Sequence, residues 1–259
     1  MSRAEGVDRV STEVVLADGV RAWMYCPPGA ASGLPALVIG AEATGVNAFI
    51  HDTARKLADI GFVTVVPDYY RGAGPSDPED YSNIADIMRN VDALDFPRAT
   101  EDLMLSFQYL VEHPRVDPDR IGVWGYCTGA TLAWLTASLR RDAALAVLFY
   151  PSQPVFDEHS LERPVSPIDL LWNLRCPTYF VYGTLDPVMP VELRNELRNR
   201  LRHWRIEYEL RLYKDCGHSF GAPVPGGQNS AAYQAAWEEA VSYAATKLRA
   251  GQPRHQEGN

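Results

Sequence analysis

Short apolar runs and segments of helical periodicity alternate along most of the chain. Residues 10–16 and 20–25 each alternate apolar and polar positions around Ala17-Asp18-Gly19, which predicts an antiparallel hairpin at the edge of a sheet. Further strands are predicted at residues 36–40, 62–66, 121–124, 144–150, 178–183 and 206–213. The first of these is continuously apolar, which is typical of strands covered on both faces of a sheet.

Segments with apolar residues at helical spacing separate these strands. Within residues 97–113, Leu103, Phe107 and Leu110 lie on one helical face, and residues 48–60 end at a glycine, as helices often do. Further helices are predicted from Ala130 and at residues 191–203 and 231–249. Because strands and helices alternate, we expect an α/β fold with a mostly parallel central sheet of about eight strands, covered by helices on both faces.

Two segments interrupt this alternation. Residues 72–95 are polar and rich in Pro and Asp, with helical character only around 84–91, and residues 153–172 are irregular. Irregular segments of this length usually cover or border a site. No linker-like stretch divides the remainder, which predicts a flexible N-terminus over residues 1–9, a single domain over 10–250 and a disordered tail over 251–259.

Charge and cysteine usage limit the classes of partner. The 259 residues carry a formal net charge of -9, which argues against nucleic acid or an anionic membrane as the main partner. We find no secretion signal and no apolar run of membrane-spanning length, so a cytoplasmic protein is expected. The four cysteines are widely spaced, which favours a reducing compartment over a disulfide scaffold or a zinc site. Cys216 and His218 could supply two metal ligands, but no others are near in sequence, and no metal or cofactor is predicted.

A cysteine lies between the predicted strand at 121–124 and the helix that begins at Ala130. The sequence Gly125-Tyr126-Cys127-Thr128-Gly129 has the form of a nucleophile elbow, in which the flanking glycines leave room for a sharp turn. At a helix N-terminus the helix dipole favours the thiolate, which is the attacking form of cysteine. The pentapeptide by itself could also form a plain turn around a buried, unreactive cysteine.

Two later loops carry the residue types that would complete a catalytic triad. Asp186 follows the predicted strand at 178–183, and His218 follows the last strand. Loops at the carboxyl ends of parallel strands meet at one edge of a sheet, and the order nucleophile, acid, histidine matches one known triad arrangement. His218 would accept the thiol proton, and Asp186 would orient the imidazole ring. The alternatives are a turn former for Asp186 and a surface histidine for His218.

The remaining parts of such a site would come from backbone amides. The amide of Thr128 and that of Ala43, in the loop after the strand at 36–40, are the expected oxyanion donors. Glu42 in the same loop is unexpected, because a carboxylate beside the thiol would raise its pKa and oppose activation. A solvated loop residue is the simpler interpretation of Glu42.

Several of these segments resemble the dienelactone hydrolase family, whose carboxymethylenebutenolidase-like enzymes have the α/β-hydrolase fold. The resemblance implies hydrolysis of a small-molecule lactone or ester, with Cys127, Asp186 and His218 as the triad. It also implies that Glu42 contacts the cysteine at rest and is displaced by substrate so that the thiolate forms. The matching segments are Ala41-Glu42-Ala43-Thr44-Gly45-Val46-Asn47, Pro67-Asp68-Tyr69-Tyr70, Gly125-Tyr126-Cys127-Thr128-Gly129, Gly183-Thr184-Leu185-Asp186-Pro187 and Gly217-His218-Ser219-Phe220.

The chain departs from the family where a substrate carboxylate would bind. Relatives hold that carboxylate with arginines, one of them a few residues after the histidine, where this chain has Ser219-Phe220-Gly221. Arg89 is the nearest candidate for the other arginine, although Met88 lies closer to the matching position. We therefore expect substrate contacts from Arg89, Tyr150, Ser219 and Phe220. Further candidates for the pocket wall, each of which could equally belong to the core, are Tyr69, Tyr70, Met88, Phe149 and Trp172.

Other functions remain compatible with the same residues. The triad could serve a non-hydrolytic reaction, since this fold changes chemistry by changing its loops. A non-catalytic member could bind a ligand or sense oxidants through Cys127. The sequence leaves open the identity of the substrate and the oligomeric state, monomer or dimer.

Overall fold

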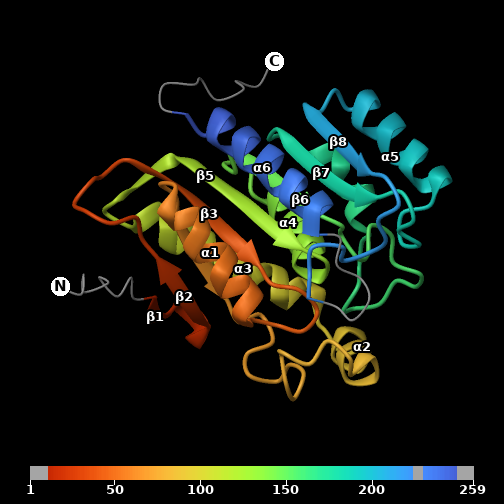
Figure 1. Cartoon of the computed structure of the whole chain (residues 1–259), viewed down its shortest axis with the longest axis horizontal. Helices are drawn as coiled ribbons and strands as arrows, with labels where there is room; N and C mark the ends of the chain where they lie inside the picture. The colour runs from red at the N-terminus through yellow and green to blue at the C-terminus, as the bar shows by residue number, and fades with distance from the viewer. Residues whose placement is uncertain (1–10, 224–229, 250–259) are drawn as a thin grey trace, which may run out of the picture.

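The hairpin predicted at the start of the chain forms the edge of the sheet. In the computed structural model, which describes residues 11–223 and 230–249, strand β1 (Thr12–Val15) pairs antiparallel with β2 (Arg21–Tyr25), and β2 pairs antiparallel with β4 (Val63–Pro67). The other neighbouring strands pair parallel, and these are β3 (Leu34–Gly40), β5 (Val116–Tyr126), β6 (Leu145–Phe149), β7 (Thr178–Gly183) and β8 (Tyr208–Tyr213). Within the described residues the strand order is β1-β2-β4-β3-β5-β6-β7-β8, which confirms the predicted sheet of about eight mostly parallel strands (Figure 1).

Helices cover both faces of this sheet, as predicted. Helices α1 (Ala48–Asp59) and α6 (Ser230–Lys247) lie in front of it in Figure 1, whereas α3 (Phe96–Glu112) and α4 (Thr128–Leu139) lie behind it. Helix α5 (Val191–His203) contacts η2 (Pro167–Asn173), which packs on α4. In the described part of the chain no helix has the length and apolar character needed to span a membrane.

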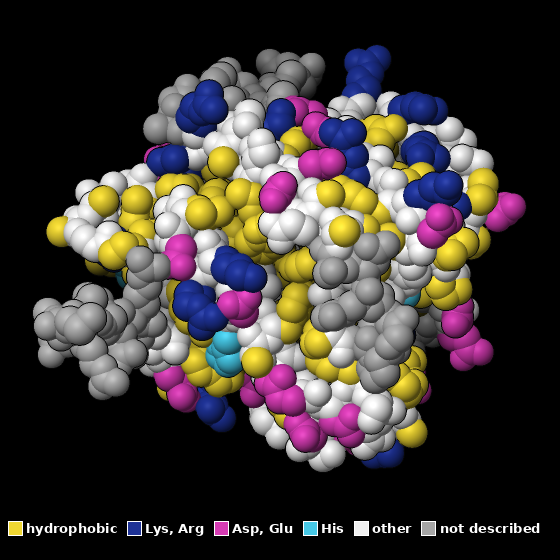
Figure 2. Space-filling model, viewed as in Figure 1, with side chains coloured by type: hydrophobic (Ala, Val, Ile, Leu, Met, Phe, Trp, Pro, Cys, Tyr) yellow, Lys and Arg dark blue, Asp and Glu magenta, His cyan; other side chains and the backbone are white. Residues whose placement is uncertain are grey.

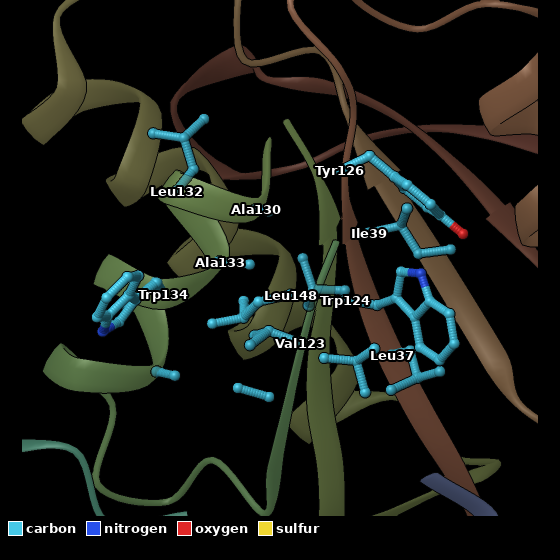
Figure 3. Packing of buried hydrophobic residues seen from close by; sticks show 14 of the residues in the cluster. Leu37, Ile39, Val123, Trp124, Tyr126, Ala130, Leu132, Ala133, Trp134 and Leu148 are labelled. Atoms are coloured by element: carbon cyan, nitrogen blue, oxygen red, sulfur yellow. The ribbon is translucent and has the colours of Figure 1, made fainter. Parts of the chain in front are cut away.

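The central strand β5 sends alternate side chains to opposite faces. Trp124 and Tyr126 point away from α4 in Figure 3, and Trp124 packs edge-on against Trp237 of α6, with ring centroids 5.4 Å apart. Val123 lies on the other side of the strand, toward α4. Because β5 is buried on both faces from Ile121 onward and nearly all of α4 is buried, the strand-turn-helix segment is held in the core.

Strand β5 begins five residues before the predicted start at 121. The charged residues around Pro118 break the apolar pattern, yet Val116 still pairs with Leu34 of β3 before a register irregularity leads to the regular pairing from Ile121. A bulge lets a strand continue past a residue that cannot donate to the ladder. This pairing depends on a partner strand distant in sequence, which explains why the local pattern missed it.

The two irregular segments lie against each other. The first contains α2 (Ile84–Asp92), close to the helical stretch predicted at 84–91. In the second, the Arg163 guanidinium donates to the carbonyls of Val91 and Asp92 over 2.8 and 3.1 Å, and lies over the ring of Phe96. A cation at the carbonyl end of a helix is electrostatically favourable. The first segment is therefore fastened at its helical end by the second.

A buried ion pair anchors the beginning of the first segment. Arg71 follows β4 with a φ of 52°, and its Nε and Nη2 donate to the two carboxylate oxygens of Asp102 in α3 over 3.0 and 2.6 Å. The Asp102 side chain is fully buried. A bidentate pair of this kind is both strong and geometrically specific.

The predicted division of the chain stays a prediction. The expected N-terminal segment 1–9 and tail 251–259 lie outside the described residues, and the single domain over 10–250 is not tested by the sheet alone. The sheet does draw strands from residues 12 to 213, so the described core of that span is continuous.

Candidate active site

The turn between β5 and α4 places Cys127 at the helix N-terminus. Cys127 has φ 50° and ψ −117°, a conformation that a residue with a side chain rarely adopts, and its N–H donates to the Phe149 carbonyl over 3.0 Å. A Cβ on Gly125 would lie 2.3 Å from the Gly129 carbonyl, and one on Gly129 would lie 2.2 Å from the Ala41 carbonyl. Both glycines are therefore required by the close approach of β5, α4 and the end of β3.

His218 and Asp186 reach this cysteine from the loops after β8 and β7. The Nε2 atom of His218 lies 3.2 Å from Sγ of Cys127, and its Nδ1 lies 3.0 Å from Oδ2 of Asp186. The other Asp186 oxygen accepts the N–H of Val188 over 2.9 Å, which fixes the carboxylate. The structure thus brings the three predicted triad residues together in a single hydrogen-bonded series.

The electrostatics of this series favour an ion pair. Burial raises the pKa of the Cys127 thiol, but the charge and hydrogen bond of His218 outweigh it and lower that pKa below its ordinary value. Burial likewise lowers the pKa of His218, while the Cys127 thiolate and Asp186 raise it to about 10. Each partner stabilises the charged form of the other, as in other Cys–His pairs. The contacts thus shift the thiol toward its ionised form and the imidazole toward its protonated form.

Glu42 is buried and hydrogen-bonded to tyrosines. The Tyr81 hydroxyl donates to its Oε2 over 2.8 Å, and the Tyr150 hydroxyl donates to its Oε1 over 3.4 Å. Burial raises the pKa of Glu42 to about 7, against the lowering effects of Tyr81, His218 and Tyr150. The solvated-loop interpretation of Glu42 is wrong, because the first irregular segment covers it. In this structure Glu42 is bonded to tyrosines, whereas the Cys127 thiol is paired with His218.

The two expected oxyanion donors belong to the elbow and to the loop after β3. Thr128 is the first residue of α4, where an amide has no acceptor one turn earlier in the helix. Ala43 lies in the loop after β3, where hydroxyls hold the backbone: that of Tyr69 donates to the Glu42 carbonyl over 2.6 Å and that of Tyr70 to the Ala43 carbonyl over 2.9 Å. Tyr69 and Tyr70 therefore hold the backbone of the loop after β3.

The candidate substrate contacts divide into two groups. Tyr150 is fully buried and meets the ring of His218 edge-on, with centroids 5.5 Å apart, and Phe220 packs on Tyr150. Ser219 has a φ of 54° and is partly exposed beside them. Arg89 is not brought to this group: its side chain is 71% exposed, and it pairs with Asp86 on the same helix. Of the other pocket candidates, Met88 and Trp172 are half exposed, while Tyr69, Tyr70 and Phe149 are buried.

Sequence reasoning assigned no role to Tyr81, Asn47 or Ser152. Tyr81 is the single aromatic residue in the sequence of the polar segment 72–95, which is only a weak signal of a functional role. Asn47 precedes the predicted helix at 48–60, and that position predicts an N-cap. The Ser152 N–H donates to the Cys127 carbonyl over 3.2 Å, and its hydroxyl lies 3.3 Å from that of Thr128. Contacts of this kind follow no sequence period.

The described residues offer no obvious metal site. Among residues 11–223 and 230–249, no three His, Cys, Asp or Glu side chains are grouped as ligands. Cys216 contacts the Lys214 carbonyl through its thiol, and His218 is engaged by Asp186 and Cys127. The pairing of Cys216 with His218 at a metal thus has no third ligand within this part of the chain.

Comparisons with known proteins show which family the sequence matches. A model of the dienelactone hydrolase family matches residues 20–248. A protein of Bradyrhizobium sp., named as a 2-oxo-3-(5-oxofuran-2-ylidene)propanoate lactonase, is 30% identical over 210 residues, which cover 81% of this chain and 83% of the relative. A Yersinia pestis protein named as a carboxymethylenebutenolidase is 27% identical over 227 residues, which cover 87% and 83%.

Solved structures share the fold. A Klebsiella pneumoniae structure titled as a dienelactone hydrolase superposes with a TM-score of 0.82 at 24% identity, covering 91% of this chain and 98% of that one. The dienelactone hydrolase-like promiscuous phosphotriesterase P91, from metagenomic libraries, gives 0.74 at 18% identity, covering 92% and 98%. At these identities the structures show the α/β-hydrolase fold and nothing of the substrate.

Proposed function

The chain belongs to the dienelactone hydrolase family and is a lactone or ester hydrolase, and we propose that Cys127 is its nucleophile. The observation that supports this role most directly is the series from Sγ of Cys127 through the His218 ring to Asp186, with contacts of 3.2 and 3.0 Å. A thiolate paired with an imidazolium is ready to attack an activated carbonyl.

The proposed reaction passes through an acyl-enzyme. The Cys127 sulfur forms a bond to the carbonyl carbon, and the carbonyl electrons move onto oxygen, where the amides of Thr128 and Ala43 would donate to the oxyanion. When the carbonyl re-forms, the C–O bond breaks, and the departing enolate or alkoxide takes the proton from Nε2 of His218.

Water completes the reaction. Neutral His218 removes a proton from a water molecule, whose oxygen attacks the thioester carbon, and the C–S bond breaks to return the thiolate and the imidazolium. The sum is one lactone or ester plus one water giving the ring-opened acid, or an acid and an alcohol. Asp186 holds the imidazole orientation through both steps.

The surroundings of Cys127 favour an uncharged substrate. Ser219 and Phe220 follow His218 where the family resemblance implies an arginine, and Arg89 is paired with Asp86 at the surface. Residues 72–95 carry six acidic side chains and one arginine, and Figure 2 shows acidic side chains gathered over this region at the lower centre of the view. An acidic surface repels an anion on approach. We therefore propose that uncharged enol lactones and aryl esters are better substrates than carboxylated lactones.

The first experiment is steady-state hydrolysis of three substrates, a carboxylated dienelactone, an uncharged enol lactone and an aryl acetate, by wild type and Cys127→Ala. Preferred turnover of the uncharged substrates by wild type, with an inactive variant, is the expected result. Turnover by Cys127→Ala equal to that of wild type would refute the role of Cys127 as the nucleophile. A preference for the carboxylated lactone, the substrate type in the name of the Bradyrhizobium relative, would overturn the charge argument alone.

A cysteine nucleophile favours a reducing cellular compartment. A thiolate nucleophile is lost on oxidation, and the cysteines within the described residues, Cys26, Cys127, Cys176 and Cys216, are all free thiols. We propose that the enzyme works in the cytoplasm, where thiols stay reduced, as a single domain over residues 10–250.

A further inference from the structure

A series of hydrogen bonds runs from the N-terminus of α1 to Glu42. Asn47 is the N-cap of α1, and its Oδ1 accepts the N–H of Ile50 over 3.1 Å. Its Nδ2 lies 2.7 Å from the Tyr81 hydroxyl, and 3.1 Å from both the Pro78 carbonyl and the Thr44 hydroxyl. Tyr81 in turn bonds Oε2 of Glu42.

The direction of this series is fixed by its ends. The Ile50 N–H can only donate and the Pro78 carbonyl can only accept, so the Asn47 amide has one possible orientation. Its Nδ2 therefore donates to the Tyr81 oxygen. The single hydrogen of the Tyr81 hydroxyl is then left for Glu42, over 2.8 Å.

We propose that Asn47 and Tyr81 are positioning residues that hold the Glu42 carboxylate on the side of the first irregular segment and leave the Cys127 thiol to His218. This inference rests on the proposed function, because the position of Glu42 matters for the reaction only if Cys127 is the nucleophile. Neither residue touches the reacting sulfur in the structure; both act through Glu42.

The location of Tyr81 links Glu42 to the segment that covers it. Glu79 accepts the N–H of Ala48 over 2.7 Å, so residues 78–81 are fastened to the first turn of α1 through a side chain as well as through Asn47. An acceptor at a helix N-terminus is favoured by the helix dipole. Glu42 is thus held by the same contacts that seat this part of the segment.

The charge of Glu42 acts directly on the thiol. A Glu42 carboxylate raises the pKa of Cys127, whereas hydrogen bonds donated to that carboxylate favour its ionised form. The titratable groups that face Glu42 from the elements packed around it are Tyr69, Tyr81, Cys127, Tyr150, His218 and Tyr233. His218 supplies the positive charge among them, and the tyrosines are uncharged near neutral pH.

The test measures the alkylation of Cys127 by iodoacetamide between pH 5 and 10 in the free enzyme. We expect the wild-type rate to show an inflection near pH 7, where Glu42 ionises, and Glu42→Gln to lack it. In Tyr81→Phe the carboxylate loses its donor, so the inflection moves up by about one pH unit. Asn47→Asp retains an acceptor for Ile50 but offers the Tyr81 hydroxyl a competing acceptor, and it moves the inflection the same way.

The double variant separates positioning from a general charge effect. If Asn47 acts through Tyr81, Asn47→Asp adds no further shift in the Tyr81→Phe background. An inflection that stays at the wild-type pH in Tyr81→Phe, or an undiminished Asn47→Asp shift in the double variant, would overturn the proposal. Asn83→Asp is the matched control, because Asn83 caps α2 in the same way within the same segment, and it should leave the profile unchanged.

Tyr81→Phe removes only one oxygen from a buried side chain. If circular dichroism shows that Asn47→Asp does not fold, the pH profile of Tyr81→Phe tests the positioning role by itself. Alkylation needs no turnover, so a missing pH shift contradicts the positioning role. Cys127-independent hydrolysis of the aryl acetate would instead contradict the proposed function.

Discussion

The sulfur of Cys127 lies 3.2 Å from Nε2 of His218, a residue 91 positions later in the chain, although the carboxylate of Glu42 is buried in the same site. Glu42 is bonded by Tyr81 and Tyr150 instead. The thiol is thus already paired with its base, and the carboxylate that would oppose ionisation is held by other partners.

Replacing the nucleophile should abolish turnover. Cys127→Ala removes the attacking sulfur, so kcat/KM for an uncharged enol lactone should fall by about 10³-fold or more. The matched control is Cys26→Ala, which removes a partly buried thiol at the end of β2 and should retain wild-type kinetics. Activity of Cys127→Ala within a few-fold of wild type would exclude covalent catalysis by this cysteine.

Neutralising Asp186 should impair His218 without removing it. Asp186→Asn presents an amide to Nδ1, which disturbs the tautomer and orientation of the ring, and kcat should fall by about 10²–10⁴-fold. Asp215→Asn serves as the comparison, because Asp215 lies three residues before His218 in the same loop but is largely exposed. Equal rates for the two variants would show that the ring does not depend on Asp186.

Removing His218 should reverse the thiol pKa shift. With His218 present the pKa of Cys127 lies below the ordinary thiol value of 9.0, so alkylation should be half-maximal below that pH. In His218→Gln the raising effect of burial remains without its opponent, so the midpoint should move above 9.0. The pH dependence of the iodoacetamide rate measures this midpoint, and an unchanged midpoint would contradict the ion pair.

Glu42→Gln should stabilise the protein, and the gain should depend on pH. Folding raises the pKa of Glu42 from 4.5 to about 7. The stability that protonated Glu42 contributes to the fold is therefore fully present below pH 4.5 and is lost as the pH rises through 7. Relative to the variant, wild type should lose about 3 kcal/mol across this window and no more above it. Urea unfolding at several pH values measures the difference, with exposed Glu158→Gln as the flat control. A difference independent of pH would mean that Glu42 keeps an ordinary pKa.

Breaking the buried ion pair should destabilise the fold. Arg71→Met leaves the Asp102 carboxylate buried without its partner, at a cost of about 3–5 kcal/mol in unfolding free energy. Arg89→Ala removes an exposed pair with Asp86 and should change stability by less than about 0.5 kcal/mol. Arg89→Ala should also leave KM for an uncharged ester unchanged, and a raised KM would restore Arg89 as a substrate contact.

Much of the framework could be predicted from local pattern. Five of the strands, β3 to β7, contain short apolar runs that are buried on both faces of the sheet, whereas β8 at its edge is partly exposed. The segment from Gly125 to Gly129 indicated its own turn, because only glycine tolerates the close backbone approach on both sides of Cys127. Asp186 and His218 followed from their places after β7 and β8, since the carboxyl ends of parallel strands lie at one edge.

Other features depended on contacts that have no period in the sequence. The early start of β5 required its pairing with β3, and the ion pair of Arg71 with Asp102 joins residues 31 positions apart. Arg89 was the arginine nearest to the family position in sequence, yet its side chain lies largely in solvent. Such outcomes depend on how a segment is seated, and residues 72–95 have too few apolar positions to determine that locally.

The sequence by itself therefore determined the layered sheet, the elbow and the order of the three residues that meet there, because burial and backbone sterics act on neighbouring residues. Only the tertiary structure decided the surroundings of Glu42. Its burial, its bond to Tyr81 and the orientation imposed by Asn47 arise where the first irregular segment folds back over the loop after β3. Hydrogen bonds between distant, irregular segments depend on the final position of both, and no local rule supplies that position.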